Sequence, residues 1–411
     1  MALLLTGGRL IDGTGAEPRR DAAVLVEGER VRAVGPAGAL DLPPDTRVVD
    51  VGGRTIMPGI IDCHDHLAHT GFDVVGRLAS PPSLTVLRIA GFIRTTLEAG
   101  ITTVRDAGGL DAGFKQAVEQ GLIPGPRLVV SLVILSRTGG IGDPRLSTGV
   151  DLSGELAGMP SPVCDGADEC RRRVRQVLHA GADVVKCAST GGVSSRTLTA
   201  TDPTFTYEEL KAITDEAHAL GRRVMVHAYG GPGLEAAIEA GVDSVEHGAY
   251  LCRTPEILDR MAAQGTYLVP TLMVLALHRE KGSPWARRKA TELHEDHVRT
   301  LEMAMARGIP IAMGTDAGAY GHGHNAVELR LMVEAGMTPM QAIVASTKTA
   351  AECAGLGVEV GTLEPGKYAD LLVVDGNPLD DMQVLDRQER LALVMKGGTA
   401  YVDRLSDAAV R

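Results

Sequence analysis

Aromatic side chains are scarce in this sequence, since Phe, Trp and Tyr together make up 3% of its 411 residues. Few rings are therefore available to stack on the bases or sugars of a ligand. Basic side chains are in the minority as well, because 41 Lys and Arg stand against 52 Asp and Glu and leave a net charge of −11. A nucleic-acid partner calls for a basic face and a membrane surface for a basic amphipathic helix, and the sequence has neither. We expect no nucleic acid and no membrane among its partners.

The sequence also has too few cysteines for a disulfide-rich protein and no apolar run long enough for a membrane-spanning one. None of the six Cys residues forms a Cys-x-x-Cys pair, and six are too few for a disulfide framework in a chain of this length. No stretch reaches the roughly 18 apolar residues of a membrane span, and the first residues lack the pattern of a signal peptide. These absences favour a cytoplasmic protein that acts on a small molecule. Nothing marks a subunit interface, and a homo-oligomer is expected only as the common case.

Glycine is abundant, at 50 of 411 residues, and it punctuates a repeating pattern in the middle of the chain. Apolar runs of strand length alternate there with helical stretches that mostly end at a Gly, the residue that best accepts the left-handed conformation of a helix C-terminal cap. The runs are Ile56–Ile61, Ile101–Val104, Arg127–Leu135, Asp183–Lys186, Arg223–Val226, Val242–Val245, Thr266–Val269 and Ile309–Met313. The helices are expected to close on Gly100, Gly121, Gly181, Gly221, Gly241, Gly265, Gly308 and Gly336.

Near-continuous apolar strands between capped helices are typical of a parallel sheet covered by helices. Eight such units predict an α/β fold, a (β/α)8 TIM-type barrel over residues 58–362. An open, doubly wound sheet is the alternative, and it would carry a Gly-rich phosphate-binding turn after an early strand. The turn after the first run reads His64-Asp65-His66 instead.

The two ends of the chain have a different character. Both contain short β segments separated by Gly and Pro turns. These segments are Leu3–Leu5, Ala23–Glu27, Arg30–Val34, Thr46–Val51, Leu371–Val374 and Leu391–Lys396. We expect residues 1–57 and 363–411 to pair into one small β-sandwich domain beside the barrel.

Residues that can bind a metal follow several of the apolar runs, at the strand ends where a barrel of this type has its active site. The first run ends in His64-Asp65-His66, the fourth at Lys186, the fifth at His227, the sixth at His247 and the eighth at Asp316. His64 and His66 are two apart on an extended chain and point the same way, so both can bind one ion. Imidazole and carboxylate ligands suit Zn²⁺, with Co, Mn and Ni as alternatives.

Lys186 is the unusual member of this set, because a Lys directed into a barrel mouth costs free energy unless it is paired or neutral. One interpretation is an ordinary salt bridge at the surface. The other is carboxylation by CO2, which turns the ammonium into a carbamate whose two oxygens can bridge two metal ions. His227 and His247 are then available to bind the second ion.

Together these residues resemble the amidohydrolase superfamily, in motifs spread over nearly the whole chain. The motifs are Met57–His66, the run ending at Lys186, His227, His247, Gly314-Thr315-Asp316 and the returning segment Gly361–Leu371. Within the superfamily, the sequence is most similar to the binuclear Xaa-Pro dipeptidases, Xaa-Arg/Lys carboxypeptidases and ochratoxin-type amidases. That similarity rests on Gly191-Gly192-Val193, His227-Ala228-Tyr229, Glu246-His247-Gly248 and Asp316-Ala317-Gly318.

The resemblance implies a hydrolase that cleaves a peptide-like or N-acyl amide bond with a hydroxide bridging two divalent metal ions. It implies that His64 and His66 hold the more buried ion, and that His227 and His247 hold the more exposed one. Carboxylated Lys186 would bridge the two ions. The same comparison makes Asp316 both a metal ligand and the catalytic base, and it has Tyr229 polarise the scissile carbonyl.

One position departs from the pattern of this subgroup. Its members often carry a His after Thr-Gly-Gly in the loop following strand three, where this chain has Thr138-Gly139-Gly140-Ile141. Ile141 cannot donate a hydrogen bond to a substrate, and this brings a carbamate, urea or ester into consideration as the substrate. Two further loop residues are candidate substrate contacts: Arg196, as the partner of a carboxylate, and His324.

Two alternatives belong to other classes. A mononuclear deaminase of the same superfamily needs a Glu shortly after the fifth-strand His, and His227 is followed by no Glu before Glu235. A non-catalytic barrel should have lost some of its metal ligands, and all six candidates are present. Both observations favour the hydrolase.

Overall fold

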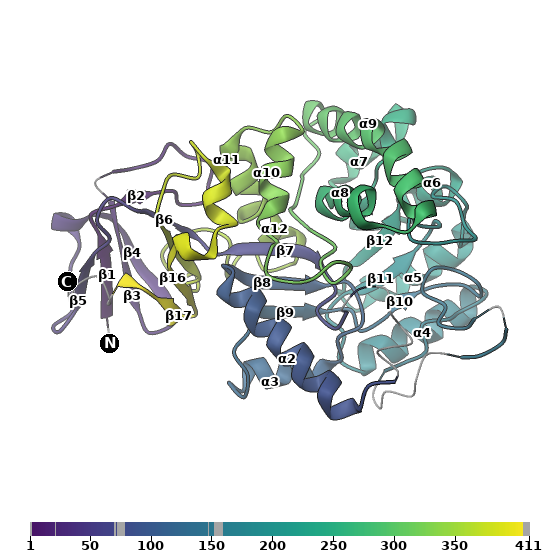
Figure 1. Ribbon diagram of the computed structural model, residues 1–411, viewed down its shortest axis with the longest axis horizontal. Helices are drawn as coiled ribbons and strands as arrows, with labels where there is room; N and C mark the ends of the chain where they lie inside the picture. Colours follow the sequence, from purple (N-terminus) through teal and green to yellow (C-terminus); the bar gives the residue numbers. More distant parts are fainter. Residues whose placement is uncertain are drawn as a thin grey trace.

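The computed structural model describes residues 2–20, 22–69, 71, 79–146, 148–151 and 159–405. Strands from both ends of the chain gather at one end of the molecule, and the helix-rich middle of the chain fills the other (Figure 1). Mixed α/β content is therefore observed, with strands and helices alternating through the middle. None of the helices in the described ranges is long and apolar enough to cross a membrane.

The terminal strands form two sheets. The first has the order β4-β3-β1-β5, from Arg30–Pro36, Ala22–Glu27, Ala2–Thr6 and Arg47–Asp50. The second has the order β17-β16-β15-β6-β2, from Thr399–Asp403, Leu391–Lys396, Leu371–Val374, Thr55–Pro58 and Arg9–Leu10. Side chains of both sheets, among them Val24, Ile56 and Val373, share one buried apolar cluster. The two ends of the chain are thus joined, because β15 pairs antiparallel with β6.

The first expected barrel strand, Ile56–Ile61, is wrong as a single element. Residues up to Pro58 belong to β6 in the terminal sheet, and β7 (Ile60–Asp65) starts a different, parallel sheet. Gly59 is the break: its N–H donates to the carbonyl oxygen of Asp370 (2.9 Å), and a Cβ there would lie 2.1 Å from Oγ1 of Thr102. Hydrophobicity alone cannot separate two strands that are both fully buried.

The middle of the chain builds two parallel sheets. One has the order β7-β8-β9, with β8 at Ile101–Asp106 and β9 at Arg127–Val130. The other has the order β10-β11-β12-β13-β14, at Ile134–Leu135, Val185–Ala188, Val224–Ala228, Ser244–His247 and Tyr267–Val269. The expected run Arg127–Leu135 therefore supplies two strands, separated where Leu132 takes a positive φ of 66°.

The eighth expected strand, Ile309–Met313, is not a regular strand. It makes a single bridge, between Ile311 and Leu268 of β14. Backbone hydrogen bonds still connect it on both sides, from the Ala312 N–H to the Leu268 oxygen (3.0 Å) and from the Cys63 N–H to the Met313 oxygen (2.9 Å). Pro310 has no N–H to donate, which limits the pairing. The segment thus lies between β14 and β7.

Helices follow most of the parallel strands. They are α2 (Pro82–Glu98), α3 (Ala112–Glu119), α4 (Ala167–His179), α5 (Tyr207–Ala219), α6 (Pro232–Ala240), α7 (Pro255–Gln264), α8 (Leu272–Lys281), α9 (Pro284–Ala306), α10 (Val327–Glu334), α11 (Pro339–Ala345) and α12 (Lys348–Cys353), with short 3-10 turns at Ala37–Ala39, Leu251–Arg253, Met382–Leu385 and Gln388–Arg390. All eight glycines expected to close helices have positive φ, from 65° at Gly221 to 104° at Gly181. That expectation is confirmed.

Candidate metal centre

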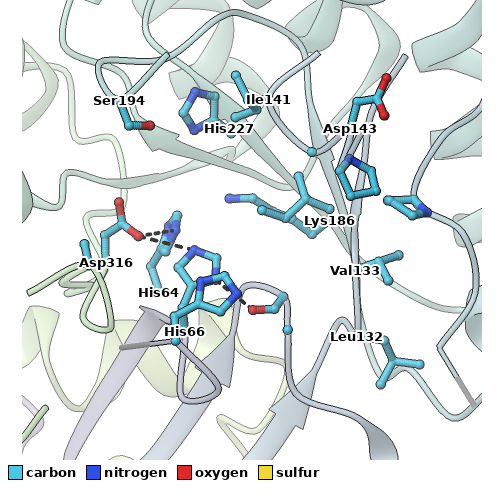
Figure 2. Close-up of a pocket in the computed structure, with 18 of the residues that line it drawn as sticks. His64, His66, Leu132, Val133, Ile141, Asp143, Lys186, Ser194, His227 and Asp316 are labelled. Atoms are coloured by element: carbon cyan, nitrogen blue, oxygen red, sulfur yellow. Dashed lines mark hydrogen bonds and ion pairs between the residues drawn. The ribbon is translucent and has the colours of Figure 1, made fainter. Parts of the chain in front are cut away.

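Parallel strands deliver the candidate ligands to one place. His64 comes from β7, Lys186 from β11, His227 from β12 and His247 from the end of β13, while Asp316 follows the segment that lies between β14 and β7. One ligand atom each of His64, His247 and Asp316 lies within 4.8 Å of the others. Figure 2 shows His64, His66 and Asp316 facing one another, with Lys186 and His227 directed toward the same space.

His64 and His66 each have one ring nitrogen committed to a protein acceptor. Nδ1 of His64 lies 2.8 Å from Oε2 of Glu246, and Nδ1 of His66 lies 2.8 Å from the carbonyl oxygen of Gly108. Both contacts place the ring proton on Nδ1, which leaves the lone pair on Nε2. The two Nε2 atoms face Oδ1 of Asp316, at 3.6 and 3.3 Å. Acceptors behind a ligating imidazole orient it and raise its basicity toward a metal.

His227 and His247 form a pair that a cation would complete. Nε2 of His227 lies 3.0 Å from the Gly191 carbonyl oxygen. Nδ1 of His247 lies 2.7 Å from Oγ1 of Thr271, whose own proton goes to the carbonyl oxygen of Pro270. The remaining nitrogens, Nδ1 of His227 and Nε2 of His247, face each other at 2.9 Å.

Burial, helped by the nearby Lys186 charge, lowers the pKa of His227 to about 3, and burial also puts the pKa of His247 well below its usual value. Both rings are therefore neutral at pH 7 and present two lone pairs to the same gap. A cation between them satisfies both nitrogens at once, so the donor set fits a metal ion.

Lys186 is buried beside these rings, and its Nζ has no hydrogen-bond partner among the described residues. Burial lowers the pKa of its amine to about 8. Buried polar groups in proteins have hydrogen-bond partners. A buried amine without one therefore calls for an ion beside it or a covalent change of the amine itself. The amine also has a larger neutral fraction at pH 7 than an exposed Lys has.

Asp316 stays ionised in this environment. Burial on its own raises the pKa of the carboxyl group, but His64, His66 and Lys186 around it leave the value below its usual range. Asp316 also has a positive φ of 58°, and His247 one of 73°, in a region that few residues other than Gly adopt. Strain of this kind gathers at functional sites, and here it falls on two of the candidate ligands.

A buried charge network that the sequence reasoning missed supports His64. Glu246 accepts from Nη2 of Arg105 (2.9 Å) and from Oγ of Ser244 (2.6 Å) while it contacts His64. Arg105 also donates from Nε to the carbonyl oxygen of Cys63 (2.7 Å). Burial raises the pKa of Glu246, yet Arg105 and His64 bring it down to about 2. Arg105 and Glu246 each follow directly on an apolar run of strand length, and this was the available signal.

Another missed contact involves His297 on α9, which lies in the charge-rich segment His294-Glu295-Asp296-His297. In the structure its side chain is buried, and its ring interacts with the backbone of Pro270 and His247. The helix face that carries it is therefore buried beside the backbone of His247 rather than exposed to solvent.

The ligands line one end of a cavity of about 720 Å³. Tyr229 lies at that end, stacked on the His247 ring at 4.9 Å between centroids. Ile141 lines the cavity on the side of His227 (Figure 2). The two other expected substrate contacts lie elsewhere. Arg196 packs over the Trp285 ring (5.8 Å to its centroid), and His324 is largely exposed beside Asp386; neither is among the described residues that line the cavity.

This donor set, at the C-terminal ends of parallel strands, defines a candidate metal-dependent hydrolase. A sequence profile of the amidohydrolase family matches residues 55–401. The chain is also 32% identical to an ochratoxinase of Aspergillus niger, in an alignment of 424 positions that covers 97% of this chain and 86% of that protein. The chain belongs to the amidohydrolase family, and it is a hydrolase that acts on amide C–N bonds.

Solved structures support this assignment over the full length. A prolidase in complex with N-methylphosphonate-L-proline is 31% identical with a TM-score of 0.90, covering 98% of this chain and 100% of that one. The structure of A. niger ochratoxinase is 30% identical with a TM-score of 0.88, covering 98% of this chain and 96% of that one. The arrangement of sheets and helices described above is therefore the fold of this family.

Proposed function

We propose that this protein is a binuclear metal-dependent hydrolase in which His64 and His66 hold one ion, His227 and His247 hold the other, and carboxylated Lys186 bridges them. The observation that carries the proposal is the buried Lys186 amine, which lacks a partner in the described residues and lies close to the neutral rings of His227 and His247. A carbamate on Nζ supplies two anionic oxygens where the imidazoles offer only neutral nitrogens. Zn²⁺ suits these donors, with Co, Mn and Ni as alternatives.

Two divalent ions here would supply Lewis acidity and bring the pKa of a water molecule toward about 7. Asp316 then takes the proton of the attacking water and returns it to the leaving amine, as an ionised carboxylate at neutral pH can. Tyr229 donates its phenol hydrogen bond to the oxygen of the scissile carbonyl as charge develops there. Glu246 keeps His64 in one tautomer throughout.

We propose that the bond cleaved is the amide of a small peptide-like or N-acyl molecule. Relatives named as ochratoxinase and prolidase align with this chain over nearly its whole length. The cavity of about 720 Å³ suits a small molecule rather than a folded protein chain.

The proposal includes the architecture expected from the sequence. Residues 58–362 would close as a (β/α)8 barrel, in which the irregular segment 309–313 takes the position of the eighth strand. The hydrogen bonds of that segment to β14 and β7 support closure. Residues 1–57 and 363–411 would form the small β-sandwich, supported by the apolar cluster shared by the two terminal sheets; residues 1, 21 and 406–411 lie outside the described part.

Metal content per chain tests the function directly. The native protein, expressed with added Zn²⁺ and ¹³C-bicarbonate, should carry two ions and a carbamate carbon visible by NMR. Lys186→Met should lose the carbamate signal, one or both ions and the activity on amides. Lys281→Met, at the exposed end of α8, is the matched control and should keep all three. Full metal content in Lys186→Met would contradict the bridging role.

A further inference from the structure

The cavity has a second wall, opposite the metal centre, and that wall is apolar. It is formed by the link between β9 and β10 and by two loop segments (Figure 2). Its apolar side chains are Leu132, Val133, Ile134, Pro144, Leu146, Met159, Pro160 and Pro162. We call these residues, together with Asp143 and Arg145, the distal wall. A substrate bound at the metal centre places its substituent against it.

Asp143 and Arg145 are the charged side chains among the described residues of this wall, and they neutralise each other. Arg145 donates from Nε to Oδ1 of Asp143 (2.9 Å) and from Nη2 to Oδ2 (2.9 Å). Asp143 also accepts from the backbone N–H groups of Gly139 (2.8 Å) and of Arg145 itself (3.0 Å). In this bidentate, charge-assisted pair, each charge is compensated by a partner from the same loop.

Arg145 bonds Asp143 through its Nε and Nη2 edge, and its side chain is 40% exposed whereas that of Asp143 is 4% exposed. A substrate carboxylate at the Nη1 side of the guanidinium would leave this pair intact, but it would enter a cluster that already holds more negative than positive charge. Arg145 is held further by Oγ1 of Thr138 (3.1 Å), and the negative charges of Asp151 and Asp165 lie close to it. The guanidinium is therefore already surrounded by acidic partners.

Two basic residues near the cavity, Lys289 and Arg196, have partners outside the distal wall. Lys289 donates from Nζ to the carbonyl oxygens of Gly192, Ser195 and Leu198, at 3.1, 2.6 and 2.6 Å, which fixes the loop that carries Arg196. Arg196 itself packs on Trp285, off the cavity. Within the described lining, then, Arg145 is the cation of the distal wall, and it lies among Asp143, Asp151 and Asp165, a cluster whose charge does not favour a further anion.

We propose that the substituent of the substrate that lies on the distal wall is uncharged and apolar, so that the preferred substrate is a neutral amide with an alkyl or aryl group rather than a dipeptide or N-acyl amino acid with a free carboxylate. This inference rests on the proposed hydrolase function and narrows its substrate class. An apolar substituent gains free energy by leaving water for the apolar side chains of the wall, whereas a carboxylate would give up its hydration beside the acidic cluster around Arg145.

Two pairs of benzamides isolate the charge. N-(3-methylbutyl)benzamide and N-benzoyl-L-leucine share the acyl group and the branched side chain and differ only by the carboxylate. A second pair, with and without a carboxylate para on the benzoyl ring, places the charge on the acyl side. In at least one pair the neutral member should have a kcat/KM roughly tenfold or more above that of its acid. Equal or higher kcat/KM for the acid in both pairs would overturn the inference.

The double variant Asp143→Asn/Arg145→Met removes both charges of the pair and tests whether the guanidinium serves a carboxylate. Both residues are changed together, because Arg145→Met alone would leave the Asp143 charge uncompensated and repel an acid in either case. The double variant should keep the ratio of kcat/KM between acid and neutral amide, and a selective loss of its activity on the acid overturns the inference.

Failure of the hydrolase function would give a different result, namely no turnover of any member. The pairs are then compared as ligands of the metal-loaded protein by calorimetry. Tighter binding of a neutral member keeps the inference while the function fails, whereas tighter binding of the acids, or no binding of either neutral member, overturns the inference as well.

Discussion

Each imidazole at the candidate metal centre has one nitrogen committed to an acceptor of the protein, and this selects the nitrogen left for an ion. Glu246 and the Gly108 carbonyl leave Nε2 of His64 and His66, whereas the Gly191 carbonyl leaves Nδ1 of His227. Since the tautomers are fixed before any ion arrives, binding needs little rearrangement. The chemistry of the site is thus prepared by groups that never contact the ion.

Asp316→Asn should keep the fold and lose turnover. The amide has nearly the shape of the carboxylate and keeps an oxygen beside His64 and His66, but it cannot take a proton from water. We expect kcat to fall by about 10²- to 10⁴-fold, with the melting temperature and circular dichroism close to native. Steady-state kinetics on an N-acyl amide measures this, and the exposed Asp375→Asn serves as control. Near-native turnover in Asp316→Asn would rule out the role of base.

At the scale of elements, α8 and α10 together fix the orientation of His247, the candidate ligand at the end of β13. Glu328 of α10 accepts from the N–H groups of Leu272 and Met273 at the start of α8, both at 2.7 Å. The preceding residue, Thr271, has a positive φ of 53° and brings its Oγ1 to His247. The carboxylate cap of α8 therefore fixes the residue that orients His247, a contact between segments far apart in the sequence.

Thr271→Val should weaken metal binding, because the isosteric side chain leaves Nδ1–H of His247 buried without an acceptor, at a cost of about 1–3 kcal/mol. We expect a loss of roughly 10- to 100-fold in metal affinity. Competition with a chelator of known affinity gives the value. Thr271→Ser keeps the hydroxyl and should bind nearly as the native protein does. Equal affinities for Val and Ser variants would show that this hydrogen bond does not tune the site.

Much of this element scale was predictable from the sequence. β15 and β16 occupy the residues expected for them, because turn residues bound both apolar runs. The split at Gly59 and the irregular segment around Pro310 were missed, since hydrophobicity reports burial and not which sheet a strand joins. Strand ends pointed to His64, Lys186 and Asp316, while the Asp143–Arg145 pair depends on loop geometry that local patterns do not encode.

At the scale of the whole molecule, Lys396 connects the terminal sheets to the parallel part. It ends β16 and donates from Nζ to the carbonyl oxygen of Gly125 (2.5 Å), in the connection between α3 and β9. Burial, with a contribution from Arg127, lowers the pKa of this amine from 10.5 to about 8. The folded state therefore disfavours the charged form.

The free energy of unfolding should consequently rise with pH between about 8 and 10.5 through this residue. Below pH 8 both states carry the charge and the penalty is complete; in the window, the unfolded chain binds more protons, so the slope is positive. Lys396→Met should remove about 1–2 kcal/mol of that rise, a figure reduced for the partial exposure of the group. Urea unfolding at several pH values measures it, with Lys281→Met as control. Parallel pH profiles for native and Lys396→Met would contradict the assignment.

The candidate ligands come from β7, β11, β12, β13 and the segment after residue 313, so a bound ion ties most of the parallel part of the molecule together. An ion that binds only the folded state stabilises it by about 2.7 kcal/mol at a hundred times its dissociation constant. Removing it with a chelator should therefore lower the melting temperature by roughly 3 °C, and Zn²⁺ should restore it. The double variant His227→Ala/His247→Ala should show a smaller shift, because its two remaining imidazoles hold an ion more weakly. If the melting temperature did not change with the chelator, no ion at these residues would stabilise the fold. If the double variant kept the full shift, the stabilising ion would lie away from these residues.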